Sequence, residues 1–478
     1  MEHLDVLIIG AGISGIGAGC HLTMTAPEQS FAVLEGRDNL GGTWDLFKYP
    51  GIRSDSDMYT FGYAFRPWTQ GNDIASAASI LRYLKETSEA YGVDKKIRYG
   101  HRVTKVNWSS PDKRWVVDVA GPDGEFQMSC KFLLTCTGYY DYDKAYLPKF
   151  DGYDDYQGQV VQPQFWPQDL DYKDKTVLVI GSGATAITLV PSMAGETKHI
   201  TMLQRSPTYV FTRPAADKIA NTLRKIFPQK IAYSLARTKN VLLNIFMFHR
   251  ARTKPEKVRE FLSNMAKEEL GDSVDVDVHF NPRYNPWDQR LCLIPDSDLF
   301  NVLKDGSASI VTDHIERFTK TGVKLKSGGT IDADIIIPAT GLNLQFFGGA
   351  KTYIDDKEIH AGELINYKGM MFGNVPNMAA VFGYTNASWT LKADLTCGYV
   401  ARLLNYMDKH SYDIAMPKLS GDIETERLVN LQSGYFLRAL DILPKQGKEM
   451  PWRNPENYLK DYKTIRWGKI NDGVMSFE

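Results

Sequence analysis

The chain has 478 residues, enough for two or three domains with a core each. Hydrophobic residues make up 43% and charged residues 24%, the balance of an ordinary globular protein. The formal net charge of −1 gives no indication of a nucleic-acid partner. The five cysteines are scattered and form no CxxC pair, which argues against a disulfide framework and against a zinc or other metal site.

The start of the chain enters a strand pattern within a few residues, without a basic segment ahead of an apolar stretch. The most apolar helix candidate, Val241 to Phe248, is much shorter than the roughly 20 residues that a membrane span needs. We therefore expect a cytoplasmic protein without a membrane span.

The first predicted unit is a buried parallel strand, Asp5 to Gly10, followed by a glycine-rich turn and a helix. In Gly10-Ala-Gly12-Ile-Ser-Gly15 the glycines allow a tight turn, close approach of a pyrophosphate and close packing of helix on strand. Glu35 ends the second strand, where its carboxylate can accept hydrogen bonds from a ribose. These features predict a dinucleotide site.

The pattern restarts after residue 150 with a strand that ends at Gly181 and opens Gly181-Ser-Gly183-Ala-Thr-Ala186. Here the second strand ends in Arg205-Ser206 instead of an acid. A guanidinium beside a hydroxyl suits a 2′-phosphate, which a carboxylate would repel. The first site is therefore interpreted as an FAD site and the second as an NADPH site.

The duplication predicts an α/β protein with two Rossmann-like dinucleotide-binding domains and a helical insertion. We expect three parts: an FAD-binding domain (1–150 with 346–478), an NADPH-binding domain (151–212 with 290–345) and the insertion (213–289).

The insertion is predicted from apolar residues at helical spacing, such as Ile219, Leu223 and Ile226. It is also rich in basic residues: Arg213, Lys218, Arg224, Lys225, Lys230 and Arg237. A solvated helical face explains them best, and weak attraction to a membrane surface is the alternative.

Two further segments carry specific signals. In Gly41-Gly-Thr-Trp44 the glycines lead to an aromatic ring that can pack against a flat ligand ring. In Tyr49-Pro-Gly-Ile-Arg-Ser-Asp55 a rigid Pro-Gly turn presents a carboxylate.

These two segments resemble one fingerprint of the type I Baeyer–Villiger monooxygenases. The stretch from Tyr156 through Gly158 and Gln162 to Trp166-Pro167 resembles the other. The chain is most similar to the bacterial ethionamide-activating members, through Tyr49 to Met58, Asn285 to Leu293 and Tyr384 to Lys392.

The resemblance implies that NADPH reduces FAD and that O₂ then forms a C4a-peroxyflavin, which oxygenates a small molecule. A ketone would give an ester or lactone, and a thioether would give a sulfoxide. Arg290 matches the family's active-site arginine, which offsets the charge of the peroxide, and Asp55 matches its carboxylate partner.

The motifs and the resemblance together assign one set of residues to cofactor binding. They are Gly10, Gly12, Ser14, Gly15, Glu35, Thr43, Trp44, Asp45, Asp55, Val103, Gly181, Gly183, Thr185, Arg205, Ser206 and Trp389.

The chain departs from the fingerprint at Gln162, where the family normally has histidine, and at Tyr156, where it usually has phenylalanine. Glutamine cannot titrate near neutral pH. In the family this position lies on the inter-domain linker, so we expect the chemistry to survive while domain motion or the coupling of NADPH use to oxygenation is altered. Gln289 stands where many relatives have lysine, which weakens the expected preference for NADPH.

Two alternatives remain. The chain could be a flavin monooxygenase limited to N- or S-oxygenation, or a non-catalytic flavoprotein redox sensor. A third class, the pyridine nucleotide–disulfide reductases, is disfavoured because it needs a redox cysteine pair beside the flavin, and the sequence has no CxxC or CxxxxC.

Overall fold

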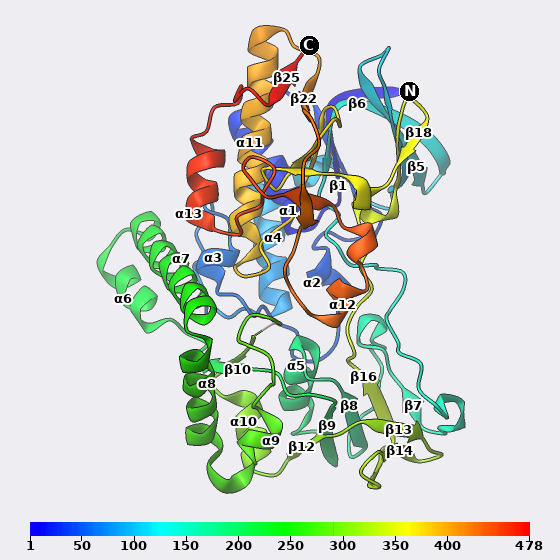
Figure 1. Ribbon diagram of the computed structural model, residues 1–478, viewed down its shortest axis with the longest axis vertical. Coiled ribbons are helices and arrows are strands. Elements are labelled where there is room, and N and C mark those ends of the chain that lie inside the picture. Colours follow the sequence, from blue (N-terminus) through cyan, green and yellow to red (C-terminus); the bar gives the residue numbers. More distant parts are fainter. Residues whose placement is uncertain (290) are drawn as a thin grey trace.

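The computed structural model describes residues 1–289 and 291–478. The chain folds into two α/β parts, one above the other, and both termini lie at the far end of the upper part (Figure 1). Each part is built on its own sheet with a parallel core. The predicted α/β class with two Rossmann-like units is confirmed.

The first sheet forms the upper part and has the order β18-β17-β4-β5-β6-β1-β2-β3, with β21 also paired to β6. Its parallel core is fully buried where β1 meets β2 and β6, because residues 6–9 and 31–34 are apolar on both faces. Buried and partly exposed residues alternate along the antiparallel strand β5. The strands before residue 150 are β1 (Glu2–Ile9), β2 (Phe31–Leu34), β3 (Ile97–Arg98), β4 (Arg102–Ser109), β5 (Arg114–Gly121) and β6 (Gly124–Thr135).

The C-terminal segment returns to this first sheet. It adds three strands, β17 (Lys351–Ile354), β18 (Lys357–Ile359) and β21 (Met378–Ala380), and the long helix α11 (Trp389–His410). The helix α11 packs against α1 (Ile13–Thr25) beside the sheet. Smaller helices on the same part are α2 (Thr43–Leu46), α3 (Met58–Phe61), α4 (Ala77–Ala90), α12 (Gly434–Leu437) and α13 (Tyr458–Asp461).

The second sheet forms the lower part and is parallel throughout, in the order β12-β9-β8-β16-β7. Its strands are β7 (Gln159–Val160), β8 (Thr176–Ile180), β9 (His199–Gln204), β12 (Ala308–Thr312) and β16 (Ile335–Pro338). The helices α5 (Ala184–Met193) and α10 (Asp298–Lys304) pack with it. Smaller sheets pair β10 (Val210–Arg213) with β11 (Cys292–Pro295), and β14 (Gly322–Leu325) with β13 (Ile315–Phe318) and β15 (Thr330–Asp332).

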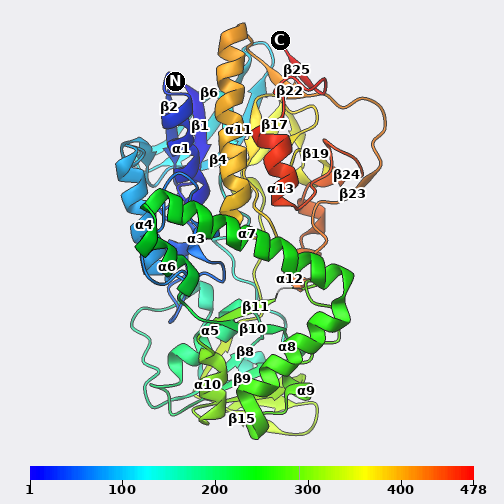
Figure 2. The ribbon, with the colours of Figure 1, turned by 90° about the vertical axis from the view of Figure 1, so that its left-hand side faces the viewer.

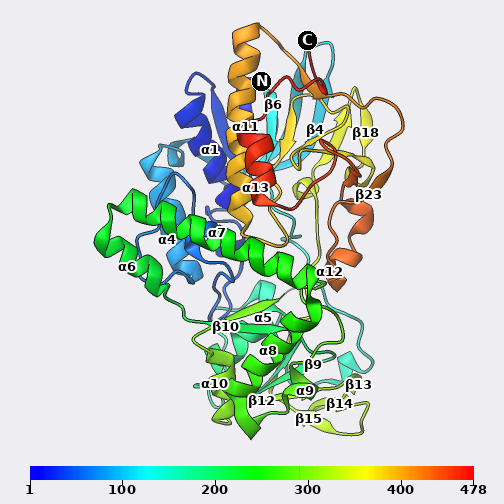
Figure 3. The same cartoon turned by 60° about the vertical axis from the view of Figure 1, so that its left-hand side comes forward.

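Between β10 and β11 the chain forms a run of helices. They are α6 (Lys218–Ile226), α7 (Gln229–Thr253), α8 (Pro255–Leu270) and α9 (Val276–His279). The helix α7 crosses the outside of the upper part, whereas α8 descends beside the second sheet (Figures 2 and 3). The predicted helix at 219–226 is present, but Ile219 and Ile226 face solvent instead of a core. Among the described residues no helix is both long and apolar enough to cross a membrane.

Candidate functional site

A cavity of about 1080 Å³ lies where the two parts meet. The carboxyl ends of β1 and β2 open onto it from the first sheet, and those of β8 and β16 open onto it from the second. Ligands of open α/β sheets bind at this edge. Both glycine motifs therefore face one shared space.

The first glycine of each motif occupies an equivalent place. Gly10 has φ +101°, and a Cβ there would lie 2.7 Å from the carbonyl oxygen of Cys136. Gly181 has φ +142°, and its Cβ would lie 2.3 Å from the carbonyl oxygen of Ala339. In both parts the turn therefore presses against the end of a neighbouring strand, which only glycine permits.

The helices that follow these turns present free N-termini to the cavity. Gly12 caps α1 and Gly183 caps α5, and neither helix has a side chain that bonds its first N–H groups. A Cβ at Gly183 would meet nothing within 4 Å. Exposed N–H groups at a helix N-terminus form an anion site, so both turns fit a pyrophosphate.

Gly15 has a packing role, as the motif predicts, and does not line the cavity. A Cβ at this position would lie 1.8 Å from the carbonyl oxygen of Gly10, so only glycine lets α1 approach β1 this closely.

Glu35 lies at the end of β2, and its side chain is held rigidly at the cavity wall. Its carboxylate accepts hydrogen bonds from the backbone N–H groups of Ala11 (2.8 Å) and Arg37 (3.0 Å). Burial raises the pKa of Glu35, and these two hydrogen bonds oppose that shift. Both Glu35 and Val103 line the cavity on the side of the first sheet.

Aromatic rings surround the centre of the cavity near α1. The indole N–H of Trp389 donates to the hydroxyl of Ser14 over 2.8 Å, and its ring lies 5.3 Å from that of Tyr139. Trp44 lies edge-on to Phe61 and, with Thr43, lines the same wall. Flat aromatic rings on this wall, one of them held by a hydrogen bond to Ser14, suit a planar ligand ring.

Asp45 does not reach the cavity wall. Its carboxylate is buried in α2 and forms ion pairs with Arg37 (2.9 Å) and Lys48 (3.0 Å). Arg37 itself lines the cavity, so Asp45 acts on the site through this arginine.

The loop 49–55 connects the two parts of the molecule. Burial raises the pKa of Tyr49 to about 12, opposed by a hydrogen bond with Thr185 of α5. Gly51 packs so closely on α5 that a Cβ would lie 1.7 Å from the hydroxyl oxygen of Ser192. Arg53 forms an ion pair with Asp298 at the start of α10. The fingerprint loop therefore fixes the second sheet against the first.

Asp55 ends this loop and lines the cavity. Its predicted partner Arg290 lies outside the described residues.

The predicted phosphate-binding pair, Arg205 and Ser206, lies exposed at the rim beyond β9. The carbonyl oxygen of Ser206 accepts a hydrogen bond from Ser182 in the second glycine motif (3.2 Å). Lys326, just beyond β14, lines the same cavity and was not predicted. No local motif marks Lys326, because only the folding of a separate three-stranded sheet brings it to the site.

The second fingerprint lies at the edge of the second sheet. The hydroxyl of Tyr156 donates to the carbonyl oxygen of Ala333 (2.7 Å), and Trp166 packs on the core of the sheet. Gln162 follows β7 and lines the cavity. Its placement there makes the departure from histidine directly relevant to the site.

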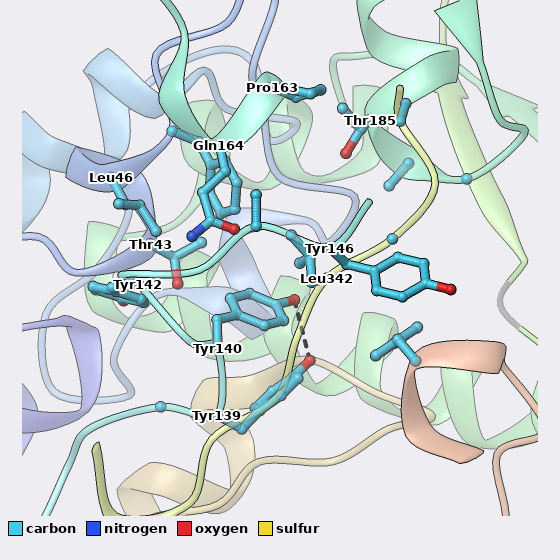
Figure 4. A pocket seen from close by; sticks show the side chains of 18 of the residues that line it. Thr43, Leu46, Tyr139, Tyr140, Tyr142, Tyr146, Pro163, Gln164, Thr185 and Leu342 are labelled. Atoms are coloured by element: carbon cyan, nitrogen blue, oxygen red, sulfur yellow. Dashed lines mark hydrogen bonds between the residues drawn. The ribbon is translucent and has the colours of Figure 1, made fainter. Parts of the chain in front are cut away.

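Four tyrosines in the crossing segment after β6 form a further wall that was not predicted: Tyr139, Tyr140, Tyr142 and Tyr146. Figure 4 shows the four rings along one irregular segment of the backbone, with Gln164 and Thr185 across the cavity from it. The hydroxyls of Tyr139 and Tyr140 are 3.3 Å apart, and the guanidinium of Arg438 lies 3.5 Å above the ring of Tyr146. These rings line the space onto which both glycine motifs open.

Comparison with known proteins agrees with this architecture. The model of the pyridine nucleotide-disulphide oxidoreductase family matches residues 7–232, which include both glycine motifs. The five cysteines are all buried and free of disulfides. Among solved structures, a steroid monooxygenase bound to NADP has a TM-score of 0.79 at 20% identity, with 99% of each chain covered. Cyclohexanone monooxygenase bound to ε-caprolactone has a TM-score of 0.75 at 17% identity, with both chains covered completely.

Sequence relatives are much more similar. FAD-containing monooxygenase EthA of Mycobacterium tuberculosis is 50% identical over 478 residues, which cover 100% of this chain and 98% of the relative. A probable FAD-binding monooxygenase, AlmA of Acinetobacter baylyi, is 47% identical over 483 residues, which cover 100% of this chain and 96% of the relative. On this identity the chain belongs to the family of FAD-containing monooxygenases: it is an NADPH-dependent flavin monooxygenase, an oxidoreductase with the fold of the Baeyer–Villiger enzymes.

Proposed function

We propose that this monooxygenase inserts one oxygen atom of O₂ into ketones, giving esters or lactones, or oxidises thioethers to sulfoxides. The observation that carries the proposal is the single cavity onto which both glycine motifs and Asp55 open. Two dinucleotides bound at those motifs would meet end to end beside Asp55, so that a reduced flavin, oxygen and substrate share one enclosed space.

We assign FAD to the domain formed by 1–150 with 346–478. The N–H groups of α1 would bind its pyrophosphate, Glu35 its ribose, and Trp44 and Trp389 would flank its ring. When bound and reduced by NADPH, FAD would supply the electrons that activate O₂.

We assign NADPH to the domain formed by 151–212 with 290–345. The N-terminus of α5 would bind its pyrophosphate, with Thr185 beside it. Arg205 and Ser206 would bind the 2′-phosphate at the rim, where Lys326 adds a second positive charge. The helical run 213–289 is then an insertion in this domain.

The chemistry of oxygen insertion creates negative charge on oxygen. We assign Arg290 to its stabilisation and Asp55 to holding that arginine in place. The tyrosine wall lines the same cavity, and a bound substrate that displaced water there would strengthen such electrostatic interactions.

The test is anaerobic reduction of the holoenzyme by NADPH, followed by rapid mixing with O₂ while the flavin spectrum is recorded. We expect a long-lived absorbance that differs from both oxidised and reduced flavin and decays faster when a ketone or thioether is added. Immediate return to oxidised flavin with stoichiometric hydrogen peroxide would contradict the proposal. Products from a thioether or amine but from no ketone would favour an enzyme limited to N- or S-oxygenation.

Replacement of Arg205 by alanine should raise the KM for NADPH about tenfold or more and leave the KM for NADH nearly unchanged. The reason is the loss of charge-assisted hydrogen bonds to the 2′-phosphate, where each 1.4 kcal/mol is a factor of ten. Steady-state kinetics with both cofactors measure the effect. Arg317→Ala removes an exposed arginine that pairs with Asp155 away from the cavity, and it should change neither KM.

Restoring the fingerprint histidine with Gln162→His should change the fraction of NADPH that is lost as hydrogen peroxide, because Gln162 lines the cavity. Product and peroxide are measured together per NADPH consumed. The matched control is Gln157→His, at an exposed position outside the cavity. An unchanged peroxide fraction and an unchanged rate in Gln162→His would show that glutamine in place of the fingerprint histidine does not affect function.

A further inference from the structure

The helices α6 and α7 carry a group of large apolar side chains on the outer surface of the molecule. Eight of them are between 40% and 66% exposed: Ile219, Ile226, Phe227, Ile231, Leu235, Leu242, Leu243 and Phe246. We call these residues the α6–α7 face. The two helices form a hairpin that projects from the side of the molecule (Figures 1 and 2). A cluster of this size is unusual on a protein surface that meets only water.

The geometry of α7 shows that this exposure is one-sided. At 3.6 residues per turn, Ile231, Leu235, Leu242 and Phe246 fall within an arc of about 60°. The opposite side of the helix is buried, with Ala232, Tyr233, Ala236 and Val241 in the core of the upper part. The helix is therefore apolar on two opposite sides, and packing within the chain accounts for only one of them.

Buried polar groups hold the hairpin in this orientation. The guanidinium of Arg237 donates to the carbonyl oxygens of Tyr59 (2.7 Å) and Gly62 (2.8 Å) and lies 3.6 Å from the carboxylate of Asp394. The hydroxyl of Tyr233 donates to the carbonyl oxygen of Tyr63 (3.0 Å). The outward stripe is thus presented by a fixed helix.

The charged residues of the segment that carries the face all have one sign, although Asp217 and Asp288 from outside it pair with Lys239 and Arg252. From Lys218 to Lys254 the sequence contains nine Lys or Arg residues and no Asp or Glu, in a chain whose net charge is −1. Six of the nine are exposed: Lys218, Lys225, Lys230, Arg250, Arg252 and Lys254. An apolar stripe with basic flanks is the composition of helices that lie in the interface of an anionic bilayer.

The positive charge also distinguishes between two possible partners of the apolar face, a second copy of this chain and a lipid surface. A second copy of this chain, related by a twofold axis, would bring the same positive flanks together and repel itself. Anionic lipid headgroups attract these residues, and the acyl-chain boundary receives the apolar side chains. We propose that the α6–α7 face docks the enzyme on an anionic lipid surface.

Flotation of the FAD-loaded enzyme with lipid vesicles tests the proposal. We expect binding to vesicles of phosphatidylglycerol and phosphatidylcholine, little binding to phosphatidylcholine alone, and weaker binding as salt is raised. The triple variant Ile231→Ser, Leu242→Ser, Phe246→Ser should bind at least about tenfold less. Each substitution removes apolar area that the bilayer would bury when the enzyme binds. Lys218→Glu, Lys225→Glu, Lys230→Glu should reduce binding similarly.

Matched controls place the same changes elsewhere on the surface. Met24→Ser, Phe126→Ser, Val278→Ser alters three exposed apolar residues, and Lys320→Glu, Lys351→Glu, Lys357→Glu reverses three exposed lysines. Both controls should bind like the unaltered enzyme. Flavin content and thermal unfolding show that each variant is folded.

Three results would overturn the proposal. Vesicle binding could be absent, or equal in the α6–α7 variants and their controls. Alternatively, the enzyme could form an oligomer without vesicles that Leu242→Ser dissociates, which would make the face an interface between subunits.

Discussion

Substitution of Arg290 by alanine should lower the yield of oxygenated product about 100-fold or more while the enzyme continues to oxidise NADPH. The expected size is that found when one preorganised group that stabilises an oxyanion is removed. Reduction of the flavin does not require this charge, so electrons should pass to O₂ and leave as hydrogen peroxide. Product, peroxide and NADPH are measured in the same reaction.

Asp55→Asn provides the comparison. It keeps the size of the side chain on the cavity wall but removes the charge that we assign to holding Arg290. The loss of product should be smaller than in Arg290→Ala, and combining the two changes should add little. A product yield per NADPH that is unchanged in Arg290→Ala would show that the resemblance to the family does not extend to this role.

Substitution of Gly10 by alanine should reduce bound FAD to about one tenth or less in the purified protein. The new Cβ would lie 2.7 Å from the carbonyl oxygen of Cys136, a backbone atom in a buried strand end that cannot move alone. The residue also has φ +101°, where an L side chain adds about 1–2 kcal/mol of strain. The turn must therefore shift and lose its fit to the pyrophosphate. The flavin absorbance per protein measures the effect.

Gly124→Ala separates the two causes. Gly124 has φ +117°, similar to Gly10, but a Cβ there would meet nothing within 4 Å. This variant shares the positive φ without the clash and lies at the first residue of β6, away from the cavity. It should retain FAD. If both variants lost FAD equally, general destabilisation would explain the result and the clash at Gly10 would not.

Much of the fold was predictable because its signals are local. A buried strand, a glycine turn and a helix N-terminus follow one another directly, from Glu2 to Ile13 in the first copy and from Thr176 to Ala184 in the second. Both copies could therefore be recognised without tertiary information. Glu35 was predicted for the same reason, since it ends the strand that follows. Asp45 shows the limit: its position near the motif is local information, but its ion pairs with Arg37 and Lys48 turn it away from the cavity.

The parts that were not predicted depend on segments that are distant in the sequence. Lys326 reaches the cavity from a separate small sheet, and the tyrosine wall is formed by a crossing segment without regular structure. The periodicity at Ile219 and Ile226 correctly indicated a helix. A period of 3.6 reports that apolar side chains share a side of the helix, but it does not say what covers them.

The helical run between β10 and β11 has a mechanical consequence. The helix α7 is fixed to the upper part through Arg237, whereas α8 packs against β10 and α10 of the lower part. Only Lys254 separates the two helices, because α7 ends at Thr253 and α8 begins at Pro255. In this run, a rotation of the lower part relative to the upper part would be taken up by the backbone torsions of this one residue. Lys254 has φ −139° and donates its N–H to the carbonyl oxygen of Arg250. A proline at this position, restricted to φ of about −65° and without an N–H, would therefore distort the junction between the two helices.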